Sequence, residues 1–517
     1  MLLSVAGAAA EALDRRNYEL KPARQEAGVR ADFDEPGRSS DTIVVLNGKK
    51  AFPDLWGEGA DNISGGSSPG SVKFFITSLE DSDTANFVAA SPGVEAHYTG
   101  TFRGALNLSK ARHIIPRVSG NIALGTTLNI DGGGRGNLSY HGHLAPEGGL
   151  AVTNAGLRVT NNDNVSLRFL RLRFGAHSIL DVDDVMYLRG NRMAVDHVSL
   201  AWGADETFTI GGEPNTTYED IIVQNTIIGQ CRDGHSTGSL IGFTGEGDNA
   251  HGAVSWHNNV YVGVTHRTPN IAGDTEMYGR IYNNIAYDWS SRLTNVVGAP
   301  KVDVAHNYYK NGPAHPRVAA SNFNQYQDLR GVRPYPPSIY TAGNIMPGVL
   351  TDPAANNEIL WTYFGTDIPL ESMLFRSTPL AIDPDVGYEP SSAQSAYDRN
   401  VVGREAGANR TTDTSGNPII GLDSIDEDYL AAITNGTDAR SPEVAWIHPP
   451  TASNPTYLDL NWNGIADGFE ATHGIAASGQ VLTQWNFGDY KVRNNAGYDA
   501  FEIYSAWVAG DFERLLE

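Results

Sequence analysis

The chain has 517 residues, 40% of them hydrophobic and 19% charged, a composition that fits a globular protein and excludes a disordered one. Its length allows one large domain with appendages. The formal net charge of −23 argues against nucleic acid as a partner, because binding phosphates requires a basic surface. An acidic polysaccharide is not excluded, since bound cations and a few arginines can reverse the charge locally.

Cys231 is the only cysteine, so an intrachain disulfide is impossible and the redox compartment stays open. No stretch approaches the length of a membrane span. Met1–Ala10 is apolar but lacks a basic segment, and it fits a trimmed export signal or a helix start equally well. We expect a monomer that binds neither nucleic acid nor membrane.

The chain divides into three parts that differ in local composition and in the pattern of apolar and turn residues. Residues 1–70 are irregular and rich in Gly, Ser and Asp, apart from a hydrophobic strand at Thr42–Leu46. Residues 71–440 alternate short β-branched runs with Gly, Asn and Asp turns. Their last part, 316–440, is rich in Pro, Asn and Tyr, and we expect long loops that pack over the body or close its end. A further unit covers 441–517.

The short runs form a repeat. Each has the length and period of a strand, lacks a helical period, and carries a polar residue between apolar ones. The polar residue returns at intervals of roughly 20 to 35 residues, which is typical of a solenoid with one strand set per turn. We predict an all-β fold, a right-handed parallel β-helix with long loops. The runs are Val165–Phe174, Met193–Leu200, Ile221–Ile228, Ala253–Val262, Arg280–Trp289 and Val302–Tyr309.

The polar residues of this repeat have a structural interpretation that we favour. Stacked asparagines inside successive coils can satisfy backbone groups at the corners, and this explains them better than a catalytic role. Asp196 and His197 are likewise interpreted as a buried hydrogen-bonded pair. The aligned positions are His197, Asn225, Asn259, Asn284 and Asn307.

An acidic cluster precedes an isolated Arg-Thr-Pro at Arg267–Pro269 within the repeat. Carboxylates from separate coils that converge on one face make a site for a hard cation. A cation beside an arginine suits an anionic sugar polymer. The alternative is a solvated acidic loop, and the spacing over two coils favours metal. The carboxylates are Asp181, Asp183, Asp184, Asp205 and Glu206.

The segment Asp459–Glu470 matches the twelve-residue calcium loop at each constrained position. Gly464 occupies the sharp turn, and two asparagines in place of aspartates lower the ligand charge. The alternative is an Asn- and Gly-rich turn without metal. The stretch Ala500–Ala509 is expected to be helical, which predicts a small C-terminal EF-hand-like calcium-loop unit with a structural role. The ligand positions are Asp459, Asn461, Asn463, Ile465, Asp467 and Glu470.

The order of these motifs along the chain and the residues within them resemble those of the pectate lyase superfamily, in particular the bacterial branch of polysaccharide lyase family 1. The resemblance covers about residues 120 to 315 well, covers the C-terminal tail moderately, and does not reach the first 70 residues. The motifs that carry it are Gly142–Gly149, Arg168–Phe174, Trp202-Gly-Ala-Asp205-Glu206, Leu240-Ile-Gly242, Arg267-Thr-Pro269 and the tail segments His473-Gly474 and Gly497–Glu502.

The resemblance implies a calcium-dependent, secreted lyase that acts on pectate or a related uronan. It implies that Arg267 is the catalytic base, that Asp205 is a calcium ligand with Glu206 as its neighbour, and that Asp181 and Asp183 are the paired aspartates. Asp184 replaces Asp183 if the alignment shifts by one residue.

Two departures from the family pattern bear on the substrate. The family's substrate-binding lysine falls at Thr237, and its second arginine falls at Ala272. His235 or Arg232 is the expected substitute for the lysine.

Two other functions compete with a lyase. A glycoside hydrolase on the same solenoid needs two carboxylates that flank the bond. Asp205 and Glu206 are adjacent in sequence and would face opposite sides of a strand, which weakens this reading. A non-catalytic glycan-binding protein, or a virion-associated tail protein, would use the β-helix as a rigid scaffold.

Overall fold

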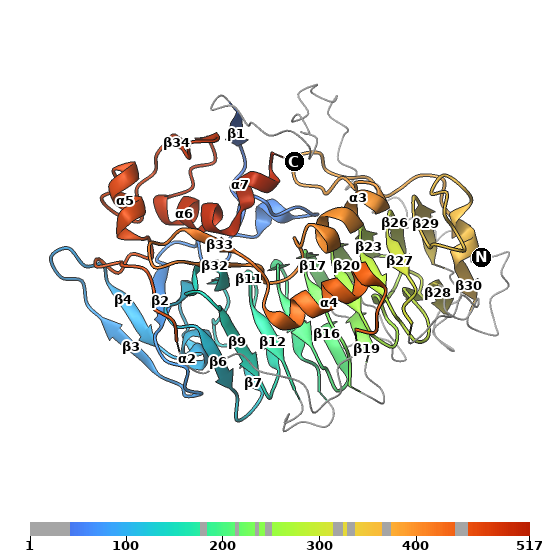
Figure 1. Cartoon of the computed structure of the whole chain (residues 1–517), viewed down its shortest axis with the longest axis horizontal. Coiled ribbons are helices and arrows are strands. Elements are labelled where there is room, and N and C mark those ends of the chain that lie inside the picture. The colour runs from blue at the N-terminus through green and yellow to red at the C-terminus, as the bar shows by residue number, and fades with distance from the viewer. Residues whose placement is uncertain are drawn as a thin grey trace, which may run out of the picture.

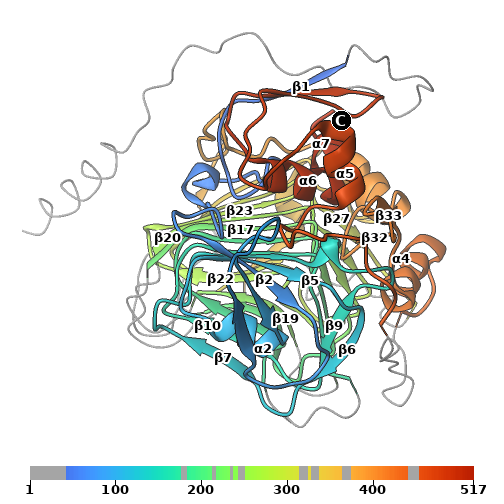
Figure 2. The same ribbon diagram turned by 90° about the vertical axis from the view of Figure 1, so that its left-hand side faces the viewer.

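The computed structural model describes residues 42–175, 183–211, 217–232, 237–242, 251–313, 324–327, 337–363, 374–439 and 453–516. Within them the chain coils through three sheets whose neighbouring strands are parallel, apart from one antiparallel edge strand. The coils stack along the long axis in Figure 1 and enclose a single core in the end-on view of Figure 2. This is the right-handed parallel β-helix that the sequence predicted.

Each coil passes from sheet 1 to sheet 2 to sheet 3. Sheet 1 contains β7 (Leu128–Asp131), β10 (Leu157–Thr160), β13 (Met186–Arg189), β16 (Glu206–Ile210), β19 (Thr237–Ile241), β22 (Asn270–Gly273), β25 (Asn295–Gly298), β28 (Asn324–Gln327) and β30 (Trp361–Tyr363). Sheet 2 contains β3 (Ala85–Val88), β4 (His97–Gly100), β2 (Val72–Ile76), β5 (Arg112–Pro116), β8 (Leu138–His141), β11 (Val165–Arg168), β14 (Met193–Asp196), β17 (Thr217–Gln224), β20 (His251–His257), β23 (Met277–Tyr282), β26 (Lys301–Ala305), β29 (Ser338–Ala342) and β31 (Leu374–Phe375). Sheet 3 contains β6 (Gly120–Ala123), β9 (Leu150–Thr153), β12 (Arg171–Arg173), β15 (Ser199–Ala201), β18 (Ile227–Ile228), β21 (Val260–Val262), β24 (Ile285–Tyr287) and β27 (Tyr308–Lys310).

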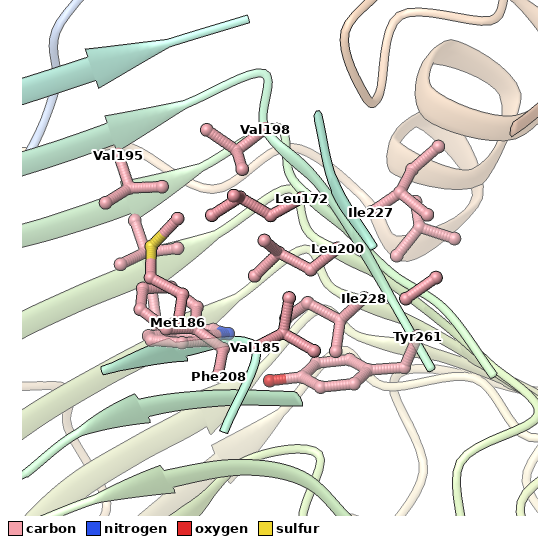
Figure 3. Packing of buried hydrophobic residues seen from close by; sticks show 14 of the residues in the cluster. Leu172, Val185, Met186, Val195, Val198, Leu200, Phe208, Ile227, Ile228 and Tyr261 are labelled. Atoms are coloured by element: carbon pink, nitrogen blue, oxygen red, sulfur yellow. The ribbon is translucent and has the colours of Figure 1, made fainter. Parts of the chain in front are cut away.

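The core is filled by one inward side chain in two along each strand, as the period of a strand requires. Figure 3 shows Leu172 and Leu200 from sheet 3, Val195 from sheet 2 and Phe208 from sheet 1 pointing into the same space. All four are at most 1% exposed. Because each buried side chain of this size contributes about 1.5–3 kcal/mol, the stacked coils hold the corners between the sheets in fixed positions.

Each predicted run in the repeat is in fact two short strands joined by a corner. The run Met193–Leu200, for example, contains β14 and most of β15, with His197 between them. The corner residues adopt a left-handed backbone, with φ of 51° at His197, 53° at Asn225 and 58° at Asn258. Asparagine tolerates this conformation better than most residues, so the apolar run continues on both sides of a bend that period alone does not reveal.

Asparagines form a ladder next to these corners, as the sequence predicted. The Oδ1 atoms of Asn259, Asn284 and Asn307 each accept a hydrogen bond from the backbone N–H of the preceding coil, at 3.0, 3.0 and 2.8 Å. The alignment of His197 and Asn225 with this ladder was wrong by one position. Strand register places both residues in the neighbouring column of left-handed corners, level with Asn258.

Two of the three outer faces are covered. On sheet 3, Arg173 donates to Asp426 of α4 (Ser424–Asn435) at 2.7 Å. On sheet 2, Arg168 donates to Asp511 of α7 (Asp511–Arg514) at 2.6 Å. On sheet 1 the outward side chain of Asn129 is exposed. Sheet 1 is therefore accessible at this first coil, whereas the outward side chains of Thr207, Thr209 and Ala272 on its later strands are buried.

The two terminal regions meet above the first coils, where Figure 1 places the C-terminal helices. Strand β1 (Ile43–Leu46) pairs in parallel with β35 (Lys491–Asn494), which pairs with β34 (Gln484–Asn486). The expected strand at Thr42–Leu46 and the expected helix at Ala500–Ala509 are thus both present. Residues 441–452 and Met1–Ala10 lie outside the described residues.

The remaining elements cap or flank the solenoid. Helix α2 (Phe102–Asn107) buries Phe102 and Leu106 at the end of the core. None of the helices in the described segments is long and apolar enough to cross a membrane. The other short elements are the turns of helix Ala60–Asn62, Gly142–Leu144, Asn357–Leu360 and Asp398–Val402, the helices α3 (Ala393–Tyr397), α5 (Asp467–His473) and α6 (Ala500–Ala509), and the strands β32 (Arg410–Thr412) and β33 (Pro418–Ile420).

Three buried histidines join the solenoid to α6. His113 Nδ1 lies 3.0 Å from His141 Nε2, and Ser505 Oγ of α6 lies 2.8 Å from His141 Nδ1 and 2.9 Å from His143 Nε2. Burial, with the positive charges of Arg168 and Lys73, lowers the pKa of His141 to about 3. Burial also holds the pKa values of His113 and His143 well below their usual range.

Acid should therefore weaken the fold. A histidine whose pKa is lowered on folding binds protons better when unfolded, so its contribution is full above pH ~6.5 and is lost as the pH falls. We expect the free energy of unfolding, measured in urea, to drop by several kcal/mol between about pH 7 and pH 5. A His141→Gln variant, which cannot titrate there, should show a shallower drop. A free energy that stays flat or rises in acid would contradict this account.

Candidate active site on one corner of the β-helix

A column of side chains runs along the corner where sheet 3 passes into sheet 1. The strand register aligns Met186 with Phe208, Glu206 with Thr237, and Leu240 with Asn270. Counting back along each coil places Asp184, Glu206 and Thr237 level with one another on three successive coils. On the fourth coil Arg267 lies beside Gly238, because Gly238 N–H donates to the carbonyl of His266 and Ser239 N–H donates to the carbonyl of Arg267. Coils in a parallel sheet lie ~4.8 Å apart, so this column brings distant parts of the sequence together.

The acidic end of the column is a cluster of three carboxylates. One oxygen from each of Asp184, Asp205 and Glu206 lies within 4.8 Å of the others. Asp184 and Glu206 are buried, and the backbone N–H of Glu206 donates to Asp184 at 3.1 Å. Burial, together with the charges of Asp205 and Asp183, raises the pKa of Asp184 to about 7. Like charges held this close favour a proton or a cation between them.

The convergence of Asp205 and Glu206 corrects the expectation that they face opposite sides of a strand. Strand β16 begins at Glu206, so Asp205 belongs to the corner and is free of the alternation that governs a strand. Adjacency in sequence therefore does not separate the two carboxylates, and it does not argue against a hydrolase.

Arg267 contacts the acidic cluster directly. Its guanidinium forms an ion pair with the carboxylate of Glu206, although the two residues lie two coils apart. Thr237 occupies the coil between them. The Arg267 side chain is 16% exposed, and burial lowers its pKa while the charges of Asp205 and Asp184 act in the opposite direction.

Asp183 lies beside the cluster and outside it. Its carboxylate accepts from Arg158 at 2.9 Å and from Thr127 at 3.2 Å. Asp184 rather than Asp183 contributes to the group of three, which matches the one-residue shift that the sequence left open. Arg158 also stacks on the ring of Tyr187, 4.3 Å from its centroid, on the outer face of sheet 1.

The other predicted catalytic and metal residues on this corner are only partly located. The backbone N–H of Arg232 donates to Gly203 at 3.0 Å, so Arg232 sits on the coil after Asp205. Asp181 and His235 lie outside the described residues. Thr237 stands in the column, at the position where the family pattern has its lysine.

Sequence reasoning missed Arg292. The sequence places the second arginine of the family pattern at Ala272, and that residue is buried beside Val297. The register aligns Asn270 with Asn295, which brings Arg292 to the next coil near Arg267, and burial and then the positive charge of Arg267 lower the pKa of Arg292. The segments Arg267-Thr-Pro-Asn and Arg292-Leu-Thr-Asn share their first and last residues, a signal that an alignment of the coils could have found.

The predicted calcium loop brings its polar side chains together. Asp459 accepts from the backbone N–H groups of Asn463 and Gly464, both at 3.0 Å. The carboxylate of Glu470 accepts from the amides of Asn461 and Asn463. Asp467, the first residue of α5, accepts from the backbone N–H of Leu460 at 3.0 Å, and Ile465 N–H donates to Asn463 Oδ1 at 2.9 Å.

Curated proteins with a similar sequence include several named probable pectate lyase C. A protein named probable pectate lyase C from Aspergillus fumigatus is 26% identical over 467 residues, 88% of this chain and 93% of the relative. One of the same name from Neosartorya fischeri is 30% identical over 286 residues, 54% of this chain and 59% of the relative. The chain thus spans about three-fifths of the length of that second relative.

Solved structures with a related outline include the major allergen from cedar pollen, at a TM-score of 0.40 and 16% identity over 68% of this chain and 92% of the other. Pectate lyase from Bacillus sp. N165 has a TM-score of 0.39 and 15% identity over 66% of this chain and 94% of the other. No protein-family model matches. The chain is thus similar in sequence to proteins named probable pectate lyase C.

Proposed function

We propose that the protein is a calcium-dependent polysaccharide lyase that cleaves polygalacturonate or a related uronan by β-elimination. The observation that carries the proposal is the contact between Arg267 and the acidic cluster. A cation site and a base on the same corner suit a substrate that presents both a carboxylate and a proton next to it.

The acidic cluster fits a divalent cation with oxygen ligands. Three carboxylates approach within 4.8 Å, and two of them are buried, which is unfavourable for the anions unless a positive charge accompanies them. Calcium takes carboxylate oxygens in flexible geometry. When bound, such an ion would neutralise the uronate carboxylate and stabilise the charge that develops as C5 loses its proton.

We assign the removal of the C5 proton to Arg267. The electrons of the C5–H bond form the C4=C5 double bond while the C4–O bond breaks, and the departing oxygen receives a proton from solvent. Arginine is an unusual base because its pKa exceeds ~12. Burial lowers the pKa of Arg267, whereas Asp205 and Asp184 favour its charged form. Neutralising those two carboxylates would remove the effect that keeps the guanidinium protonated.

One assay tests the reaction class. The protein is incubated with polygalacturonate and calcium, and both ultraviolet absorbance of the unsaturated product and new reducing ends are followed. Absorbance with new ends supports the lyase. New ends without absorbance would show a hydrolase, and neither signal across a panel of uronans would leave the non-catalytic binder. Since the substrate is a polymer found outside cells, we also propose that the protein is secreted and acts as a monomer.

We further propose that the loop Asp459–Glu470 binds a structural calcium ion. The loop packs on the first coils: Trp462 stacks on His97 with ring centroids 4.7 Å apart, and Arg117 pairs with Asp459 at 3.3 Å. Burial raises the pKa of Asp459 to about 6. An ion held here would fasten the C-terminal helices to the N-terminal end of the solenoid.

Calcium should therefore raise thermal stability through this loop. At a calcium concentration of 100 Kd we expect about 3 kcal/mol of stabilisation, seen as an upward shift in Tm that a chelator reverses. A Glu470→Gln variant should lose most of the shift, whereas Glu427→Gln, at a surface pair with Arg404, should keep it. An equal calcium response in the wild type and the Glu470→Gln protein would disprove a structural ion in the loop.

A further inference from the structure

We propose that a polar groove on the corner between sheet 1 and sheet 2 is a second, non-catalytic binding site for an acidic sugar chain. The groove has a volume of about 680 Å³. The choice of ligand rests on the lyase function proposed above, because a polyuronate is the anion that such an enzyme meets. A chain held there stays close to the protein, which raises its effective concentration at the catalytic corner.

The groove crosses the corners of four successive coils. Its lining includes Gly134 and Asn137 after β7, Asn161 after β10, Arg192 after β13, and Thr217 at the start of β17. Neighbouring coils are ~4.8 Å apart, so the groove extends roughly 14 Å along the solenoid. A short run of sugars can therefore lie along it.

The groove and the candidate active site occupy opposite ends of the sheet 1 strands. On a single coil, Asp184 of the acidic cluster precedes β13, whereas Arg189 of the groove ends it. Because a strand rises ~3.3 Å per residue, these two residues are separated by roughly 17 Å along the strand. A ligand that lies along the groove therefore does not occupy the place assigned to the cation and to proton transfer.

The wall of the groove consists of hydrogen-bonding groups. The described residues that line it include no aliphatic or aromatic side chain, in contrast to most pockets for small apolar molecules. Two of its amides are held in place, since Asn161 accepts from Arg189 at 3.2 Å and Asn191 accepts from the backbone N–H of Glu219 at 3.0 Å. Fixed amide and guanidinium groups match a ligand that carries hydroxyl groups on every ring.

The lining has an excess of positive charge on a chain whose formal net charge is −23. Arg189 and Arg192 line the groove, and Asp163 is the only acidic residue among the described residues that do so. Arg192 pairs with Asp163 at 3.3 Å, and both side chains are 45% exposed, so this pair contributes little and leaves the guanidinium available to a ligand carboxylate. Beside the groove, Asp131 and Arg135 add one charge of each sign. The excess charge favours an acidic sugar over a neutral one.

Gly134 allows the charge of the groove to be changed without removing any contact. It lines the groove, its backbone is left-handed with φ of 68°, and a Cβ atom added there would meet no atom within 4 Å. Asparagine and aspartate tolerate this backbone better than most residues. Gly134→Asp therefore adds a negative charge to the groove, and Gly134→Asn adds a side chain of nearly the same shape without that charge.

The experiment is a calorimetric titration with a galacturonate trimer in calcium. It compares Arg267→Ala, in which the trimer is not cleaved during the titration, with Gly134→Asn and Gly134→Asp made in the same background. We expect two trimers per chain for Arg267→Ala and for the Gly134→Asn protein. Gly134→Asp should raise the Kd of one of the two sites at least about fivefold, through repulsion between like charges. High salt should weaken the same site by screening.

The outcomes separate this inference from the lyase assignment. If the Gly134→Asp and Gly134→Asn proteins bind the trimer alike, or if none of the proteins binds it, the groove is not a site for an acidic sugar. An uncharged galactose trimer that occupies the groove as tightly would also overturn the proposal. A single trimer per chain, weakened by Gly134→Asp and preserved by Gly134→Asn, would support the groove and count against binding at the catalytic corner.

Discussion

An Arg267→Ala protein is expected to lose most of the proposed lyase activity, with kcat lowered about 10²- to 10⁴-fold, the usual contribution of a general base. The same change removes the ion-pair partner of Glu206, so the acidic cluster keeps its charge and its affinity for a cation. KM should change less than kcat. The measurement is the initial rate of absorbance increase on polygalacturonate, with circular dichroism to show that the variant is folded.

The pH profile offers a second check on the same residue. A base with a high pKa works only in its deprotonated form. As long as the pH stays below that pKa, the deprotonated fraction grows about tenfold for each unit by which the pH increases. Activity of the wild type should therefore rise toward alkaline pH. Because Arg404→Ala removes an arginine from a surface pair elsewhere, it should retain both the rate and the profile. Unchanged kcat in Arg267→Ala, or a wild-type optimum in acid, would remove Arg267 from the role of base.

Removing divalent cations is expected to abolish activity, and weakening the acidic cluster should raise the calcium concentration needed to restore it. Glu206→Gln keeps the shape of a buried side chain while it removes one of three carboxylate charges. Since ligand charge sets calcium affinity, the half-saturating calcium concentration should rise by at least about tenfold. Asp184→Asn should act in the same direction.

The calcium loop provides the matched control for this experiment. Glu470→Gln alters a carboxylate that contacts Asn461 and Asn463, far from the sheet 1 corner in sequence. It should lower the Tm gained from calcium and leave the calcium dependence of the rate unchanged. If Glu206→Gln and Glu470→Gln shifted the rate curve equally, the acidic cluster would not be the functional cation site.

The repeat in the sequence was enough to predict the solenoid, because inward apolar residues and polar corners recur in every coil. It was not enough to resolve the coils. Each run looked like one strand, since the bend at residues such as His197 and Asn258 depends on a left-handed backbone. The existence of a ladder of stacked asparagines was therefore predicted correctly. Asn225 was assigned to that ladder, although it lies one position out of register with it.

The candidate site was predicted in part for the same reason. Arg267, Asp205 and Glu206 stand in recognisable motifs, and the structure brings them together. Arg292 has no motif of its own, and only the fold brings it near Arg267 on the next coil. Asp205 and Glu206 were expected to diverge because a strand was assumed where the chain turns a corner.

The pairing of β1 with β35 has a consequence for how the protein is made. Coils of the solenoid contact their nearest neighbours, so they can wind progressively as a chain leaves the ribosome. Strands β1 and β35 lie almost 450 positions apart in the chain, so β1 is synthesised well before the strand that completes its sheet. The apolar side chains of β1 must therefore wait for the β35 segment, which makes the pairing of these two strands a late event in folding.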